Sequence, residues 1–134
     1  MASTQEVCKK VLEAADDCVA VGVVDLDTGM LIGVEHTIPY FTQSYLDAVA
    51  AAAVDLFRGK TVHRVEELLG KQRGEDIKDS FEEIFISSIK VFHFMRLIRE
   101  KSAVVVMVTR KTANQGLGWA ALRNNIDDIS ASLP

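Results

Sequence analysis

Asp27-Thr28-Gly29 is the stretch of this 134-residue chain that most directly suggests catalysis. Aspartic proteases carry these three residues in their active-site loop, where two Asp carboxylates share one proton across a dimer axis. An apolar pair usually precedes that loop and a small residue follows it, whereas here Asp25-Leu26 precedes and Met30 follows. We therefore interpret the stretch as a hairpin turn, in which Asp bonds to nearby backbone and Gly supplies a positive φ angle.

A second candidate motif is the glycine pair Gly116 and Gly118, which stands between a strand pattern and a helix pattern. Together with Ala121 it has the spacing G-x-G-x-x-A of dinucleotide-binding proteins. That fingerprint works inside a βαβ unit, with an acidic residue beyond the next strand. Here no strand pattern follows, and Trp119 would crowd the approach of backbone to phosphate. We interpret the glycines as structural.

The histidines and cysteines show no spacing typical of a metal site. His36, His63 and His93 fall in a loop, a helix pattern and a strand pattern, and a base or metal ligand among them is the less favoured interpretation. Cys8 and Cys18 form no C-x-x-C pair and fit free thiols in a reducing compartment. We predict no metal, no cofactor and a cytoplasmic location.

The composition excludes several classes of protein. The chain is 49% hydrophobic and 25% charged, with a formal net charge of -4, which disfavours binding to a nucleic-acid backbone. Its longest near-apolar runs, residues 48–54 and 103–108, are far shorter than the ~18–20 residues of a membrane span. The N-terminal residues carry no secretory-signal pattern. We expect residues 1–134 to form a single domain.

Hydrophobic periodicity predicts the order helix, two strands, helix, three strands, helix. The predicted elements are a helix over 4–16, strands over 18–25 and 30–34, a helix over 45–57, strands over 81–86, 90–98 and 103–109, and a helix that follows a capping box at Thr112-x-x-Gln115 and runs nearly to the C-terminus. Gly59 is expected to kink the second helix, whose apolar pattern resumes up to Gly70 before a polar connection over 71–78. The expected fold is α/β of the α+β type, a five-stranded antiparallel sheet with 103–109 at its centre and helices on both faces.

The helix pattern over residues 45–57 lacks a polar stripe. Every residue from Ala48 to Val54 is apolar, whereas a helix exposed on one side carries polar residues there. Strand 81–86 would be an open edge and an aggregation template. A two-fold pairing with a second copy buries both elements together. The predicted dimer-interface residues are Tyr45, Ala48, Val49, Ala52, Leu56, Phe81, Ile84 and Ile86.

Several stretches resemble the roadblock family, named after dynein light chains of that type. Residues 21–29 are similar to its first hairpin, and the Ala-rich residues 45–57 to its central helix. Residues 104–117, with Leu122-Arg123, are similar to its last strand, Ala-Asn-x-Gly-Leu turn and final helix. His93-Phe94-Met95-Arg96 also resembles bacterial members. The resemblance covers nearly the whole chain and includes no catalytic signature.

This resemblance implies a roadblock/profilin-like fold and a dimer that pairs through the central helix and the third strand, so that one sheet continues across two subunits. It also implies binding to small Ras-like GTPases or an adaptor role in motor and signalling assemblies. A bacterial relative is the dimeric GTPase-activating partner of the gliding-motility GTPase. The lengthened region from Gly59 to Lys78 departs from the family pattern.

We therefore predict a non-enzymatic, homodimeric regulator or scaffold of a small Ras-like GTPase, with activation of hydrolysis as one form of that regulation. The alternatives are a small-ligand sensor with a metabolite between sheet and helices, and an enzyme. Basic and acidic residues alternate over 58–76, which fits a solvated face or a docking rim. The candidates for an arginine finger, by residue type alone, are Arg58, Arg64, Arg73, Arg96 and Arg99.

Overall fold

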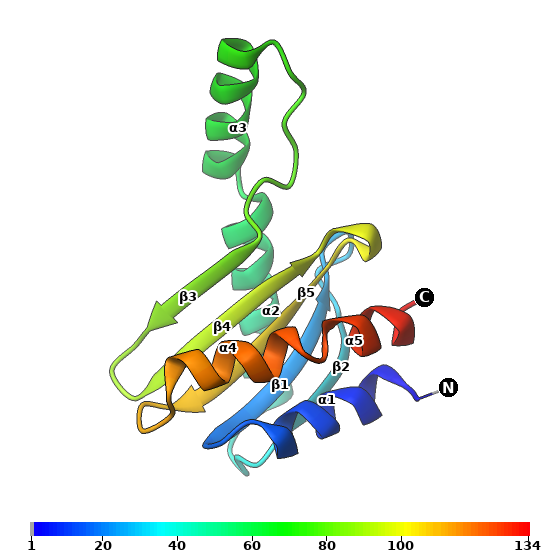
Figure 1. The fold of residues 1–134 in the computed structure, drawn as a ribbon, viewed down its shortest axis with the longest axis vertical. Helices are drawn as coiled ribbons and strands as arrows, with labels where there is room; N and C mark the ends of the chain where they lie inside the picture. The colour runs from blue at the N-terminus through cyan, green and yellow to red at the C-terminus, as the bar shows by residue number, and fades with distance from the viewer. Residues whose placement is uncertain (1) are drawn as a thin grey trace.

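A five-stranded antiparallel sheet organises the computed structural model, which describes residues 2–134 (Figure 1). Its strands are β1 (Cys18–Asp25), β2 (Leu31–His36), β3 (Glu83–Ser87), β4 (Val91–Ile98) and β5 (Ala103–Arg110), in the order β2-β1-β5-β4-β3. The central place of β5 is confirmed, because its run of β-branched residues is buried on both faces. The edges are β2 and β3.

Helices cover both faces of the sheet, as predicted. The covering helices are α1 (Thr4–Ala14), α4 (Gln115–Arg123) and α5 (Ile126–Ser132) on one face and α2 (Gln43–Arg58) on the other. Successive side chains of a strand point to opposite faces. Val105 and Met107 of β5 therefore join the core beneath α1, α4 and α5, whereas Val104 and Val106 join the core beneath α2.

The expected single kinked helix after β2 is wrong, because the chain forms two helices. α2 ends before Gly59, whose ψ of 167° is extended rather than helical, and α3 (Lys60–Arg73) begins directly after it. The Cα of Gly59 lies so close to the carbonyl oxygen of Asp55 that a β-carbon at this position would collide with it. The chain can therefore change direction there without a steric clash.

α3 and the residues 74–82 that follow it form a projection, which we call the arm (Figure 1). The predicted polar connection starts too early, since α3 continues to Arg73 and ends at Gly74 with a left-handed φ of 68°. From Gly74 the chain runs back beside α3 and enters β3. The arm stands beyond the end of the sheet and is continuous with it through α2 and β3.

The expected single C-terminal helix is also two helices, α4 and α5. The break comes at Asn125, whose side-chain amide donates to the carbonyl of Ala121 at 2.7 Å. The predicted capping box is wrong by two residues, because Asn114 caps α4 by accepting from the backbone N–H of Leu117 at 2.9 Å. The Thr112 hydroxyl instead donates to the carboxylate of Asp17, the residue before β1, at 2.9 Å.

The turn after β1 is a hairpin turn, but Asp25 rather than Asp27 bonds to it. The Asp25 carboxylate accepts from the backbone N–H and the hydroxyl of Thr28, at 3.2 and 2.6 Å. Gly29 has a φ of 75°, which confirms the expected positive value. The Asp27 carboxylate points away from the turn and pairs with Arg58 at 2.7 Å. The tripeptide is thus a structural turn in this chain.

Candidate protein-interaction surface

The middle turns of α2 expose small apolar side chains. The helix buries Ala50, Ala53 and Phe57 against the sheet. On the opposite side of its middle turns the exposed side chains are those of Ala48, Ala51 and Ala52. A helix that faced only water would carry polar residues at these positions. Asp47 and Asp55 are exposed on the same side, one turn before and one turn after Ala51, so polar residues flank this apolar stretch. Its small side chains allow another helix to approach closely.

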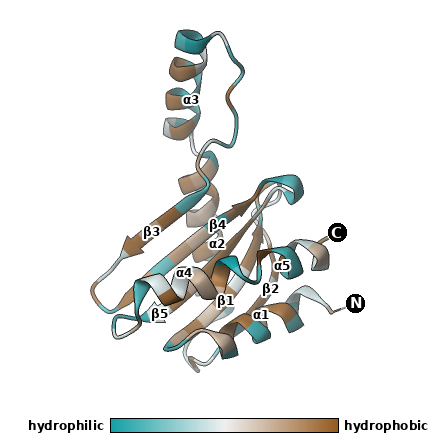
Figure 2. Cartoon of the chain, in the orientation of Figure 1, coloured by the Kyte–Doolittle hydropathy of each residue, from teal (hydrophilic) through white to brown (hydrophobic). Residues whose placement is uncertain are grey.

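β3 offers an unpaired backbone edge, and its inward side chains share the side of the sheet that α2 covers. It pairs with β4 on one side only. Ile84 and Ile86 point to the α2 side of the sheet, where Leu56 contacts the same core. Phe81, just before the strand, is 38% exposed. Figure 2 shows that β3 is largely hydrophobic, which is a hazard for an open edge strand.

The structure thus places most of the predicted interface residues on one side of the molecule. Tyr45, Ala48 and Ala52 are exposed on α2, and Val49 and Leu56 are half-buried beside them. Ile84 and Ile86 extend this side along β3, with Phe81 beyond the start of the strand. Their role in pairing stays a prediction.

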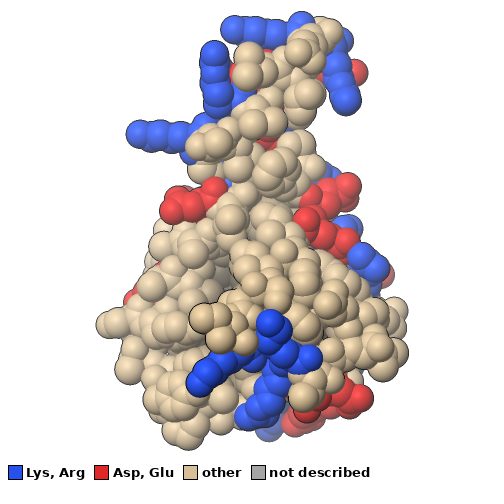
Figure 3. Space-filling model, turned by 90° about the vertical axis from the view of Figure 1, so that its left-hand side faces the viewer, with Lys and Arg blue, Asp and Glu red and all other residues tan. Residues whose placement is uncertain are grey.

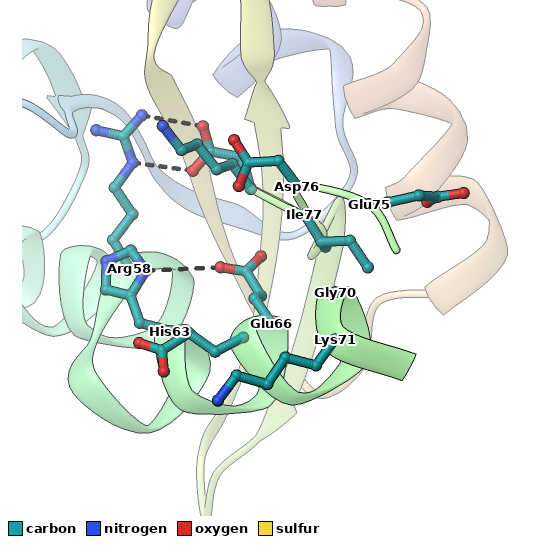
Figure 4. Close-up of a pocket in the computed structure, with 11 residues that line it drawn as sticks. Arg58, His63, Glu66, Gly70, Lys71, Glu75, Asp76 and Ile77 are labelled. Carbon is teal, nitrogen blue, oxygen red and sulfur yellow. Dashed lines mark hydrogen bonds and ion pairs between the residues drawn. The ribbon is translucent and has the colours of Figure 1, made fainter. Parts of the chain in front are cut away.

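Arg58 joins the end of α2 to the arm (Figure 4). Its Nε and Nη2 donate to the Asp79 carboxylate at 3.0 and 3.2 Å, and its Nη1 donates to Asp27 at 2.7 Å. The hydrogen bonds that Arg58 donates to the Asp79 carboxylate raise the pKa of the guanidinium above its usual range. The Arg58 head group is therefore engaged within its own chain.

Glu66 links α3 to the returning chain at the base of the arm. Its side chain is only 3% exposed, and its Oε2 accepts from the backbone N–H and hydroxyl of Ser80 at 2.7 and 2.6 Å. His63 Nδ1 lies 3.7 Å from the other carboxylate oxygen (Figure 4). Gly70 lets the returning chain pass, since a β-carbon there would lie 2.6 Å from the Glu75 carbonyl oxygen. These contacts hold the two limbs of the arm around an open polar cavity of about 630 Å³.

Three of the other candidate arginines are also engaged within the chain. Arg96 lies 3.5 Å from Glu83, and Arg64 lies 3.3 Å from Glu67. Arg99 donates to the Asp79 backbone carbonyl at 2.7 Å. The remaining candidate, Arg73 at the end of α3, has no ion-pair partner within residues 2–134. Contacts in this structure therefore select no arginine finger.

The three histidines are not brought together. His93 lies on β4 beneath α2, where burial lowers its pKa, whereas His63 is on α3 and His36 is near the Phe41 ring at a centroid distance of 5.4 Å. The cavity beneath α2 that His93 lines has a volume of only about 40 Å³, enough for water but not for a metabolite. Within residues 2–134 no three His, Cys, Asp or Glu side chains are placed to hold a metal ion.

Gly118 of the G-x-G motif has a packing role. A β-carbon on Gly118 would lie 2.8 Å from Cζ of Phe94, so the glycine lets α4 lie close to β4. Trp119 meets the same phenylalanine edge to face, with ring centroids 5.2 Å apart. Arg123 covers the indole ring at 5.0 Å. The structural interpretation of this motif is confirmed.

A further surface, not anticipated from the sequence, is a groove at the end of the sheet near the start of α2. It has a volume of about 660 Å³, and its lining includes Lys90, Arg110 and Lys111 but no carboxylate. Tyr40 and Tyr45 supply aromatic rings to it. Figure 3 shows basic side chains gathered at this end of the molecule. We call this surface the basic groove; its residues come from loops and strands far apart in the sequence, so no local pattern reveals it.

Comparison with solved structures identifies the architecture as the roadblock/LC7 fold. MglB from Myxococcus xanthus matches with a TM-score of 0.71 and 18% identity, covering 96% of this chain and 85% of its own. The gliding protein MglB from Thermus thermophilus matches at 0.72 and 16%, covering 97% and 87%. A Roadblock/LC7 domain from Streptomyces avermitilis matches at 0.69 and 11%, covering 97% of both chains.

The likeness to these proteins is one of fold. No protein-family model and no curated protein matches the sequence. One further structure with this fold is described as MglB with a tetrameric arrangement. Between residues 2 and 134, no helix has both the length and the apolar character needed to cross a bilayer.

Proposed function

We propose that this protein is a non-enzymatic homodimer that binds and modulates a small Ras-like GTPase. The proposal is carried by two features on the same side of the sheet, the exposed alanines of α2 and the open, apolar edge strand β3. The roadblock/LC7 fold supports it, because the family resemblance implies pairing through these two elements and a GTPase partner.

The homodimer would be built by a two-fold axis that sets β3 antiparallel to its copy and α2 beside the other α2. The new strand pair gives the β3 backbone its missing hydrogen bonds. The alanines of α2 let the helices come close and bury apolar surface that water now covers. The interface would comprise Tyr45, Ala48, Val49, Ala52, Leu56, Phe81, Ile84 and Ile86.

The GTPase partner is inferred from the fold together with the family resemblance. Three of the similar structures are MglB, and one of them is described as a gliding protein. We favour an action that positions the GTPase's own catalytic groups, because four of the five candidate arginines already contact acceptors within the chain, whereas Arg73 has no ion-pair partner within residues 2–134.

We further propose that the protein works in the cytoplasm. Its two cysteines are unpaired. Burial raises the pKa of Cys8 to about 12 and that of Cys18 to about 11, so both remain protonated thiols. Thiols of this kind fit a reducing compartment.

The test is a binding assay in two nucleotide states. Immobilised protein is exposed to a Ras-like GTPase from the same organism, loaded either with GDP or with a non-hydrolysable GTP analogue. We expect one state to be retained at least about tenfold more than the other, as expected when switch segments order around the γ-phosphate. Equal retention of both states, or retention of neither by any Ras-like GTPase of that organism, would refute the GTPase proposal.

A further inference from the structure

The arm exposes apolar side chains to solvent. Val65 and Leu68 of α3 are 42% and 45% exposed, and α3 extends beyond the sheet rather than packing on it (Figure 1). The arm is nevertheless fixed at its base by Glu66 with Ser80 and by Arg58 with Asp79. A fixed projection with exposed apolar side chains is suited to dock on another body.

The returning limb of the arm is acidic. Glu75 and Asp76 are exposed and form no ion pair within residues 2–134. Near them Asp79 is engaged by Arg58, and Lys78 is the one basic residue between Gly74 and β3. The limb therefore presents two free carboxylates, which lie close in sequence to the exposed and likewise unpaired Lys71 and Arg73 at the end of α3.

The basic groove has the complementary character. Lys90, Arg110 and Lys111 are exposed and form no ion pair with the described part of the chain. At its margin Ile89 and Tyr40 are 92% and 77% exposed. Three cations together with exposed apolar and aromatic side chains, in a chain of net charge -4, suit an acidic and partly apolar occupant.

Symmetry brings these two surfaces together. The arm precedes β3, and the groove lies beyond its end, next to Ile89. In an antiparallel β3 pair, the start of each strand lies beside the end of the other. The direction of α2 agrees, because the arm follows its C-terminus whereas Tyr45, near its N-terminus, lines the groove. The same two-fold axis thus carries each arm toward the groove of the other copy.

We propose that, in the homodimer on which this step depends, the arm of each copy docks in the basic groove of the other. Glu75 and Asp76 face Lys90, Arg110 and Lys111, and the exposed side of α3 covers Ile89 and Tyr40. The two copies then contact each other at two places outside the central interface, an arrangement that we call the clasp. These opposite charges fix how the two copies align and disfavour pairing with a chain that does not carry them.

Charge reversal tests the clasp. The arm variant is Glu75→Lys with Asp76→Lys, the groove variant is Lys90→Glu with Lys111→Glu, and the swap variant carries all four changes. At low ionic strength we expect each pair alone to raise the dimer Kd by about tenfold or more, and the swap to return it to within about threefold of the wild type. The matched control, Lys9→Glu with Glu13→Lys on the exposed side of α1, should leave the Kd unchanged.

Cross-linking provides a second readout that does not depend on the variants folding. Unlabelled and ¹⁵N-labelled wild-type chains are mixed, exchanged and treated with a carbodiimide, which joins amines to carboxylates in contact. We expect cross-links between differently labelled chains that join Lys90 or Lys111 to Glu75 or Asp76.

The outcomes separate this proposal from the one beneath it. A wild type that remains monomeric at micromolar concentration refutes the homodimer and the clasp together. A dimer that shows no such cross-links, and whose Kd is unchanged by either charge reversal, refutes the clasp and leaves the central interface standing.

Discussion

The guanidinium of Arg58, the last residue of α2, grips the carboxylate of Asp79 with two hydrogen bonds of 3.0 and 3.2 Å. Asp79 lies 21 residues further along the chain, at the point where the arm returns to the sheet. It also has a left-handed φ of 49°, which is uncommon for a residue other than glycine. The pair therefore holds the returning chain in a conformation that it would not prefer alone.

Breaking this pair should loosen the base of the arm. We expect Asp79→Asn to lower the free energy of unfolding by about 1–2 kcal/mol, because the half-buried guanidinium loses a charged acceptor. Urea denaturation monitored by circular dichroism measures it. The matched control is Glu67→Gln in the exposed pair with Arg64, where a change below about 0.5 kcal/mol is expected. Equal effects of the two variants would contradict this role for Arg58.

Ala52→Asp should dissociate the proposed dimer. It places a charge on the outer face of α2, and burying that charge without a partner would cost about 3–5 kcal/mol of association free energy. Sedimentation velocity at micromolar concentration should show a monomer for this variant. Ala120→Asp, on the exposed side of α4 at the opposite face of the sheet, is the control and should remain dimeric. A stable dimer of Ala52→Asp would place the interface elsewhere.

Gly118→Ala should destabilise the packing of α4 on the sheet. The new β-carbon would lie 2.8 Å from Cζ of the fully buried Phe94, and we expect a loss of about 1–3 kcal/mol. Thermal unfolding measures the effect. At Gly116, where a β-carbon would meet only the Asn114 side chain at 3.3 Å, the same change should cost less than about 1 kcal/mol. A tolerated Gly118→Ala would mean that α4 can shift away from the ring.

His93 should make the stability depend on pH. Burial lowers its folded-state pKa below the ordinary value of 6.5, so the unfolded chain binds the proton more readily. Above pH 6.5 His93 is mostly neutral in both states and has little effect on the free energy of unfolding. As the pH falls below 6.5, the unfolded chain takes up the proton more readily and the free energy of unfolding decreases. Urea midpoints compared at about pH 7.5 and 5.5 should differ less for His93→Gln than for the wild type.

The comparison needs a control for the other titrating groups. Gln72→Ala changes an exposed, uncharged residue of α3, leaves every titrating group in place and should keep the wild-type dependence. Arg123 lowers the pKa of the Glu83 carboxylate from its ordinary 4.5. The stability that this ion pair contributes is therefore lost only in solutions more acidic than those compared. A His93→Gln curve that runs parallel to that of the wild type would show that the imidazole is solvated.

The sequence by itself determined the features that depend on neighbours along the chain. Alternation and β-branched runs predict the five strands, since strand pairing follows from which side chains must avoid water. A serine or threonine just before an apolar run is a local signal for a helix start. The Ser3 and Thr42 oxygens do accept from backbone N–H groups three residues ahead. The apolar face at Ala48 and Ala52 needs only helical spacing to be noticed.

Only the tertiary structure decided the features that depend on contacts between distant residues. The sequence pattern continues through Gly59, yet the helix ends there and α3 begins in a new direction. Hydrogen bonds of Glu66 with Ser80 and of Arg58 with Asp79 hold the base of the arm. The basic groove likewise draws its residues from elements that are adjacent only after the sheet has formed. Local propensity decides which segments become helix or strand, whereas packing and long-range ion pairs decide how those segments meet.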